Sequence, residues 1–187
     1  MNRKLILSFL MLCLSCVWTL AQESLPSLPS RNLNFILISD CGMKAEKHRE
    51  IAASAAEFMS EIIRKNKIAF VAVAGDTIHD NGVQDVNDPE WQFKLEDIYG
   101  SKALHSVPWH AVPGNHEYKG NPQAVVDYSK VSKRWQTPAR YYSMEKKLKG
   151  TKDEVLLVFL DTSPLVKKRM ETFQDKVTSD YPQVEMA

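Results

Sequence analysis

The stretch 68-IAFVAVAGD-76 decides the fold. Its seven consecutive apolar residues are followed by Gly75 and Asp76. A nearly continuous apolar run of this length is typical of a strand that is buried on both faces, as in parallel sheets. A second such run, 33-LNFILIS-39, precedes it and ends in Asp40-Cys41-Gly42. The two runs predict neighbouring strands of one sheet.

Residues 45–66 separate these two runs. Apolar side chains recur there at spacings of three and four, at Ile51, Ala55, Phe58, Met59 and Ile62. This spacing indicates one face of an amphipathic helix. Strand, helix and strand in this order form a βαβ unit, whose strands pair in parallel through a right-handed crossover.

The rest of the chain continues the alternation. Apolar runs at residues 107–112 and 154–162, and an alternating stretch at 139–146, predict three further strands. Helices are expected near 90–99, over 122–134 with Asn121 as N-cap and Pro122 in the first turn, and near 165–177. The fold class is therefore α/β, a βαβαβ sheet flanked by helices.

The first residues form a separate segment. Arg3 and Lys4 precede an apolar run that ends at Leu20, and Ala21 follows, which is typical of a secretory signal peptide. We expect residues 1–21 to be cleaved and the protein to be exported, either to a periplasm or out of the cell. Residues 22–32, with two prolines and three serines, then form a flexible leader.

Two alternatives concern the same segment. A membrane anchor is the first, but the apolar run is about as short as a spanning helix can be. A lipoprotein modified at Cys16 is the second, and it is disfavoured because Cys13 stands where a branched aliphatic residue is usual. We expect no stable membrane span after cleavage.

Composition excludes several classes of protein. Hydrophobic residues make up 44% and charged residues 25%, which is a globular composition, and the formal net charge of +1 gives no surplus for nucleic acid or anionic lipid. Cleavage at residue 21 leaves Cys41 as the sole cysteine, so stability must come from core burial and not from an internal disulfide. No glycine-rich phosphate loop occurs.

Polar side chains follow three of the expected strands. Asp40, Asp76 and the pair Asn115-His116 stand within four residues after the ends of the runs 33–39, 68–74 and 107–112. Ligands of an open parallel sheet bind outside the carboxyl ends of the strands, so these side chains can converge in one crevice. Carboxylate, amide and imidazole groups together suit first-row divalent metals or iron. Taken singly, each residue could instead cap or stabilise a turn.

The motifs DCG at 40–42, GD at 75–76, GNHE at 114–117, RYYS at 140–143 and LDT at 160–162 occur in this order. As an ordered set they resemble the calcineurin-like metallophosphoesterase superfamily, and within it the tartrate-resistant, purple acid phosphatase-like branch. The resemblance covers residues 33–162. It implies half of a two-sheet α/β sandwich and a centre of two metal ions (Fe, Mn or Zn) that hydrolyses phosphate esters.

The resemblance also implies a role for each matching residue. Asp40 would bind the first metal ion, Asp76 would bridge both ions, and Asn115 would bind the second. His116 would lie outside the metal shell and bind the phosphoryl group or protonate the leaving oxygen. We expect Glu117 to orient the His116 ring from the second shell.

The sequence departs from this family in two places. His79 stands where purple phosphatases carry a tyrosine, so it can bind a metal ion but cannot form the coloured phenolate bond to ferric iron. The family also carries later GH-containing blocks with three histidine ligands, whereas the five histidines of this chain all precede residue 117. We therefore expect residues 33–187 to be the N-terminal part of a metallophosphoesterase domain, without its C-terminal ligand half and with an exposed sheet face.

The functional expectation is an exported phosphomonoesterase, incomplete in this chain, that acts on a phosphate-ester small molecule or a phosphoprotein. A phosphodiesterase or nucleotidase on the same scaffold is one alternative. A non-catalytic remnant or partner-binding fragment is another, with self-association through the exposed sheet. Residues 80–90 and 119–136, including Tyr118, Lys119, Arg134 and Trp135, are candidate walls of the crevice or ordinary loop and core residues.

Overall fold

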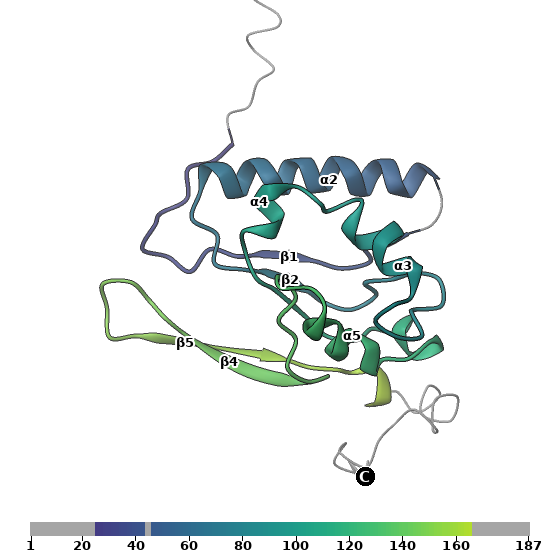
Figure 1. Ribbon diagram of the computed structural model, residues 1–187. Coiled ribbons are helices and arrows are strands. Elements are labelled where there is room, and N and C mark those ends of the chain that lie inside the picture. Colours follow the sequence, from purple (N-terminus) through teal and green to yellow (C-terminus); the bar gives the residue numbers. More distant parts are fainter. Residues whose placement is uncertain (1–24, 44–45, 166–187) are drawn as a thin grey trace, which may run out of the picture.

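The computed structural model describes residues 25–43 and 46–165 (Figure 1). The strands are β1 (Ile36–Ile38), β2 (Val71–Val73), β3 (Trp109–Ala111), β4 (Tyr142–Lys147) and β5 (Glu154–Phe159). The helices are α2 (Glu46–Lys65), α3 (Pro89–Trp91), α4 (Lys102–His105) and α5 (Gln123–Asp127). The signal peptide expected at residues 1–21, and the helix expected near 165–177 apart from its first residue, lie outside the described residues.

The central layer is a parallel sheet in the order β1-β2-β3. Ile36 is paired with Val71, and Val71 with Trp109, so β2 lies between the other two strands. All three residues of β2 are buried, as the continuous apolar run predicts. The predicted α/β class and the parallel βαβ unit are confirmed, with strands shorter than the apolar runs.

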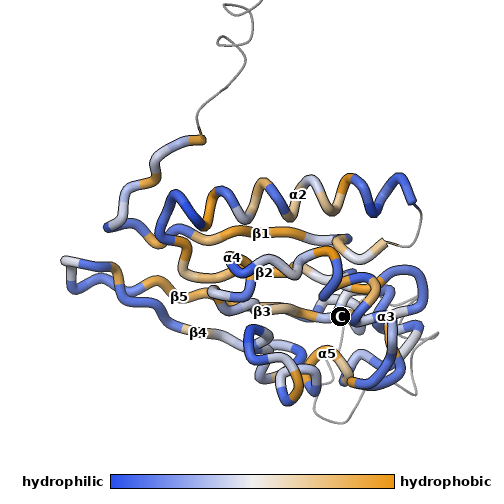
Figure 2. Tube along the Cα trace, turned by 45° about the horizontal axis from the view of Figure 1, so that its top comes forward, coloured by the Kyte–Doolittle hydropathy of each residue, from blue (hydrophilic) through white to orange (hydrophobic). Residues whose placement is uncertain are grey.

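Helix α2 runs along one face of this sheet, and the β4–β5 hairpin lies on the other side (Figures 1 and 2). The side chains of α2 that are buried are Ala52, Ala56, Met59 and Ser60. Ile51 and Phe58, which we expected to face the core, are 58% and 53% exposed. The predicted buried face is therefore wrong by about one residue, because small side chains let the helix approach the sheet and α4 closely. Ser60 Oγ lies 2.6 Å from Ser101 Oγ, at the start of α4.

The helical segment near 90–99 is present, as α3 followed by a π-helical turn, η1 (Gln92–Glu96). The Asp88 carboxylate accepts the Glu90 N–H and caps its start. The helix expected over 122–134 is shorter, consisting of α5 and one 3-10 turn, η3 (Tyr128–Lys130). Within the rest of the expected range, Trp135 takes part in a parallel bridge to Trp109 and so extends the sheet beyond β3.

The strands β4 and β5 form a separate antiparallel pair. Val155, Leu157 and Phe159 are half-buried, whereas Leu156 and Val158 on the opposite face, and Leu160 just beyond β5, are 60%, 57% and 62% exposed. Figure 2 shows β1, with its apolar residues, lying between α2 and this hairpin. Strand β5 therefore carries apolar side chains on both of its faces, and the face with Leu156 and Val158 is open to solvent.

Aromatic side chains fill the core beside β3. Trp91 stacks on Tyr128 with ring centroids 4.0 Å apart, and the ring centroids of Trp109 and Trp135 are 6.4 Å apart.

Within residues 25–43 and 46–165, no helix is long and apolar enough to cross a membrane.

Candidate metal centre

The residues that follow β1, β2 and β3 meet at one edge of the sheet, because the three strands are parallel. Asp40 follows β1, Asp76 follows β2, and Asn115 and His116 follow β3. Asp40 and Asp76 both have a left-handed backbone, with φ of 52° and 50°, which is uncommon for residues other than glycine. Each chain segment thus turns sharply at the point where its carboxylate stands.

The loops after β2 and β3 pack main chain against main chain. A Cβ on Gly75 would lie 2.8 Å from the Gly114 Cα, and a Cβ on Gly114 would lie 2.3 Å from the Asp76 main-chain N. No side chain fits into that space, so both positions require glycine. The two glycines bring Asp76 next to the loop that carries Asn115 and His116.

Three of the expected site residues form a cluster. One ligand atom from each of Asp76, His79 and His116 lies within 4.8 Å of the other two. The His79 and His116 rings lie 3.8 Å apart with an interplanar angle of 31°. Asp40 joins the cluster through its Oδ1, which lies 3.2 Å from His79 Nε2. Asn115 precedes His116 in the same loop and is half-buried.

The His116 ring is oriented by a main-chain carbonyl. Its Nδ1 lies 2.6 Å from the Asp80 carbonyl oxygen. A carbonyl oxygen can only accept, so Nδ1 carries a proton, and Nε2 is the ring nitrogen that this contact leaves for another partner. Lys119 Nζ donates to the same Asp80 oxygen at 3.0 Å and lies 3.2 Å from His116 Nδ1. The His116 main-chain N–H donates to Asp76 Oδ1 at 2.9 Å.

The contacts of Glu117 differ from the role that we expected for it. Its carboxylate accepts main-chain N–H groups from Asp76, Ile78 and Gly114, whereas the His116 ring is held by Asp80. Burial raises the pKa of the Glu117 carboxyl, and the N–H groups of Ile78 and Gly114 act in the opposite direction. Glu117 therefore binds the loops and not the imidazole.

The donor set fits a first-row metal ion. Two carboxylates (Asp40 and Asp76), an amide (Asn115) and the His79 imidazole supply oxygen and nitrogen ligands of the kind that Zn, Mn and Fe accept. Asp40, Asp76 and His79 could hold one ion, and Asp76 with Asn115 could contribute to a second.

Three residues that we named as candidate crevice walls have structural contacts instead. Trp135 is 1% exposed in the core. Arg134 is 3% exposed and donates to the Tyr99 carbonyl at 2.6 Å and to Glu96 Oε2 at 2.8 Å. Tyr118 is fully buried. Lys119, which is exposed beside His116, remains a candidate wall residue.

The loop after β3 is also hydrogen-bonded to the residues that follow the β4–β5 hairpin. The Tyr118 hydroxyl donates to Asp161 Oδ2 at 2.8 Å, and Asp161 Oδ1 accepts the Ser163 N–H at 3.2 Å. Arg140 Nη1 lies 3.5 Å from the same hydroxyl. The RYYS and LDT motifs thus contribute to a buried polar cluster that supports the loop from behind.

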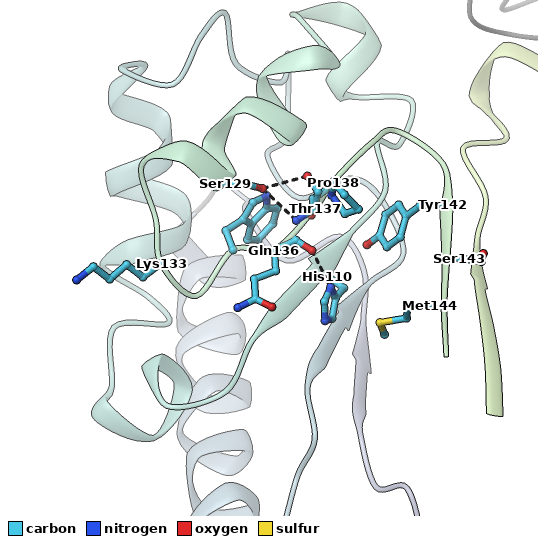
Figure 3. A pocket seen from close by; sticks show the side chains of 10 residues that line it. His110, Ser129, Lys133, Gln136, Thr137, Pro138, Tyr142, Ser143 and Met144 are labelled. Carbon is cyan, nitrogen blue, oxygen red and sulfur yellow. Dashed lines mark hydrogen bonds between the residues drawn. The ribbon is translucent and has the colours of Figure 1, made fainter. Parts of the chain in front are cut away.

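A separate cavity of about 400 Å³ lies beside β3 and β4 (Figure 3). Its lining includes His110, Gln136, Tyr142 and Met144. His110 Nδ1 lies 2.7 Å from the Gln136 carbonyl oxygen, and its Nε2 is buried without a partner. Burial is the main reason why the pKa of His110 is lowered. His110 is therefore a neutral wall residue of this cavity.

Three comparisons with known proteins show which family and fold this chain resembles. The calcineurin-like phosphoesterase family matches residues 33–183. Tartrate-resistant acid phosphatase type 5 of Mus musculus is 32% identical over 136 residues, which are 72% of this chain and 42% of that protein. The Homo sapiens protein of the same name is 34% identical over 71% of this chain and 42% of its own length. Purple acid phosphatase 7 of Arabidopsis thaliana is 31% identical over 73% of this chain and 39% of its own length.

A solved structure shows the same fold. GAP50, the anchor in the inner membrane complex of Plasmodium, superposes with a TM-score of 0.59 over 76% of this chain and 48% of that one, at 23% identity. The chain spans about 42% of the length of the acid phosphatases it matches.

Proposed function

The chain belongs to the calcineurin-like phosphoesterase family, and we propose that it is part of an exported, metal-dependent phosphoesterase that hydrolyses phosphate monoesters. The observation that carries this proposal is the cluster of Asp76, His79 and His116 at the strand ends, with Asp40 in contact. The related acid phosphatases are named for phosphate-ester hydrolysis. The substrate is a phosphate ester of a small molecule or of a phosphoprotein.

The residues of the cluster have different roles in binding the two metal ions. Asp40, Asp76 and His79 would hold one ion, and Asp76 and Asn115 would contribute to a second, which makes Asp76 the bridge. Metal ions at such a site polarise the phosphoryl group and lower the pKa of water to near neutrality. The purple colour of related phosphatases is not expected, because His79 replaces the tyrosine.

His116 acts on the leaving group. The Asp80 carbonyl fixes Nδ1, so Nε2 is the atom available to the substrate. In the protonated ring, Nε2–H would donate to a phosphoryl oxygen or to the departing oxygen. Lys119 adds a positive charge beside this ring, which favours an anionic substrate.

The test is hydrolysis of an aryl phosphate by the purified chain with added Mn, Zn or Fe, beside an Asp76→Ala variant. Metal-dependent release of phosphate that is lost in the variant supports the proposal, whereas equal rates in both proteins contradict it. An aryl phosphodiester assayed in parallel separates the proposal from its closest alternative, a phosphodiesterase or nucleotidase.

Export rests on the sequence of residues 1–21 and is tested separately. We expect the mature protein in the periplasm or the medium to begin near residue 22, as N-terminal sequencing would show. An uncleaved protein in the cytoplasm would contradict export and leave the phosphoesterase chemistry unaffected.

A second candidate function is favoured by the open face of the hairpin. Leu156, Val158 and Leu160 form an exposed aliphatic row on or just after a strand whose other face is also apolar. Such a row matches itself without any need for charge pairing, so two copies can associate about a two-fold axis. Analytical ultracentrifugation should then show a dimer that Val158→Lys dissociates. A monomer at every concentration would contradict this.

A further inference from the structure

Glu117 has an unusual set of partners for a buried carboxylate. Its side chain is fully buried, and both oxygens are used. Oε2 accepts the main-chain N–H groups of Gly114 at 2.7 Å and Asp76 at 3.1 Å. Oε1 accepts the N–H of Ile78 at 2.9 Å. The carboxylate therefore accepts hydrogen bonds from three main-chain N–H groups.

These donors come from two different loops. Asp76 and Ile78 follow β2, whereas Gly114 follows β3. A return contact runs the other way, because the His116 N–H donates to Asp76 Oδ1 at 2.9 Å. The loop after β2 donates to Glu117 and the loop after β3 donates to Asp76. The two loops are thus joined by reciprocal hydrogen bonds between side chains and main chain.

The chemistry of this link requires a carboxylate. All three partners are donors, and a carboxylate offers acceptors only. A glutamine at this position would turn an NH₂ group toward at least one main-chain N–H, and an aspartate would be one methylene too short to reach both loops. Buried N–H groups that lose their partner destabilise the local structure.

We propose that Glu117 is a positioning residue of the metal centre, which fixes the distance between Asp76 and the Asn115-His116 pair before any ion binds. The inference rests on the proposed function, because it takes these residues as the metal and substrate ligands. Asp76 adopts its left-handed backbone within this link, with φ of 50°. A site that is already formed binds its ion more tightly than one that must be ordered on binding.

The test compares Glu117→Gln with Tyr118→Phe, a matched change at the next residue of the same turn. Each removes buried hydrogen bonding, but the Tyr118 hydroxyl donates to Asp161, which is not one of the expected metal ligands. Two properties are measured in the full chain: amide hydrogen exchange by NMR without metal, and Co²⁺ affinity by titration of the visible absorption. Neither depends on hydrolytic activity.

In Glu117→Gln we expect faster exchange at the amides of Asp76, Ile78 and Gly114, and about 10- to 100-fold weaker Co²⁺ binding. Tyr118→Phe should leave Co²⁺ affinity within about twofold of the wild-type value, even if it lowers stability. Unchanged Co²⁺ affinity in Glu117→Gln would overturn the proposal. So would an equal loss in both variants, since the effect would then follow stability alone.

If Glu117→Gln does not fold, Glu117→Asp is measured in its place, with the same expectations, because it keeps the charge and shortens the reach. The outcomes for this proposal and for the proposed function can be told apart. A wild-type chain that binds no Co²⁺ contradicts the proposed function and this inference with it, whereas tight binding in both wild type and variant contradicts the inference alone.

Discussion

His79 Nε2 lies 3.2 Å from Asp40 Oδ1, so the residue three positions after Asp76 reaches back to the end of the neighbouring strand. Its ring also lies against that of His116 in a tilted arrangement, with ring centroids 3.8 Å apart. An imidazole thus lies at the centre of the cluster, at the position where the purple phosphatases carry a tyrosine.

This arrangement predicts the colour of the iron-loaded protein. The wild-type chain with iron should lack a tyrosinate-to-iron absorption band, because an imidazole cannot form the phenolate bond. His79→Tyr should gain the band, and His79→Phe, of similar size but without the hydroxyl, should not. A visible absorption spectrum of each protein decides this, and a tyrosinate-type band in the wild type would refute it.

The contact between the loops after β2 and β3 predicts that alanine destabilises the protein more at Gly75 than at Gly150. Gly75 and Gly150 have φ of 87° and 83°, but a Cβ on Gly75 would lie 2.8 Å from Gly114 Cα, whereas one on Gly150 meets nothing within 4 Å. Gly150→Ala should lower the free energy of unfolding by about 1 kcal/mol, from backbone strain alone. Gly75→Ala should lower it by about 3 kcal/mol or more. Equal values in urea denaturation would show that the loops can move apart freely.

The buried polar cluster that supports the loop after β3 predicts that two tyrosines contribute differently to stability. Tyr118 donates to the Asp161 carboxylate at 2.8 Å, and Tyr142 donates to the neutral Ala111 carbonyl at 3.2 Å. Hydrogen bonds to charged groups contribute about 1.5–3 kcal/mol and neutral ones about 0.5–1.5 kcal/mol. Tyr118→Phe should therefore destabilise the protein more than Tyr142→Phe in chemical denaturation. The reverse order would contradict this reading of the cluster.

His110 predicts part of the pH dependence of stability. Its pKa is lowered in the folded protein, mainly by burial, so below about pH 6.5 the unfolded chain binds the proton more readily. Stability that is present above about pH 6.5 is lost as the pH falls through that value, by at most about 1.4 kcal/mol per pH unit for one group.

His110→Gln removes this titration, since glutamine binds no proton in that range. Between about pH 7 and pH 5.5 the variant should lose less stability than the wild type. The neighbouring Lys146, which also lowers the pKa of His110, is present in both proteins and therefore cancels in the comparison. Parallel losses in the two proteins would show that His110 does not titrate in this window.

The sequence predicted the frame of the site because that frame depends on hydrophobic runs. Three apolar stretches specify three parallel strands, and the parallel arrangement brings Asp40, Asp76 and His116 to one edge. The buried face of α2 was less predictable. Its apolar spacing fits two adjacent faces, and close packing against the sheet selects the one with Ala52 and Ala56, leaving Ile51 exposed.

The contacts that fix the site could not be predicted from residue types. The Asp80 carbonyl orients His116, and three N–H groups hold Glu117, but every residue carries such main-chain atoms whatever its side chain. The burial of Arg134 and Trp135 depends on the bridge between Trp109 and Trp135, a long-range pairing that no local pattern signals.

The most direct test of the account is the metal affinity of Asp76→Asn. Asparagine keeps the size of the side chain and an oxygen to accept the His116 N–H, but it removes the charge that would bridge the ions. Isothermal titration with Mn²⁺ or Zn²⁺ should show binding to the wild-type chain and at least about 100-fold weaker binding to the variant. Equal affinity and stoichiometry in the two proteins would contradict the claim that the strand ends form a metal centre.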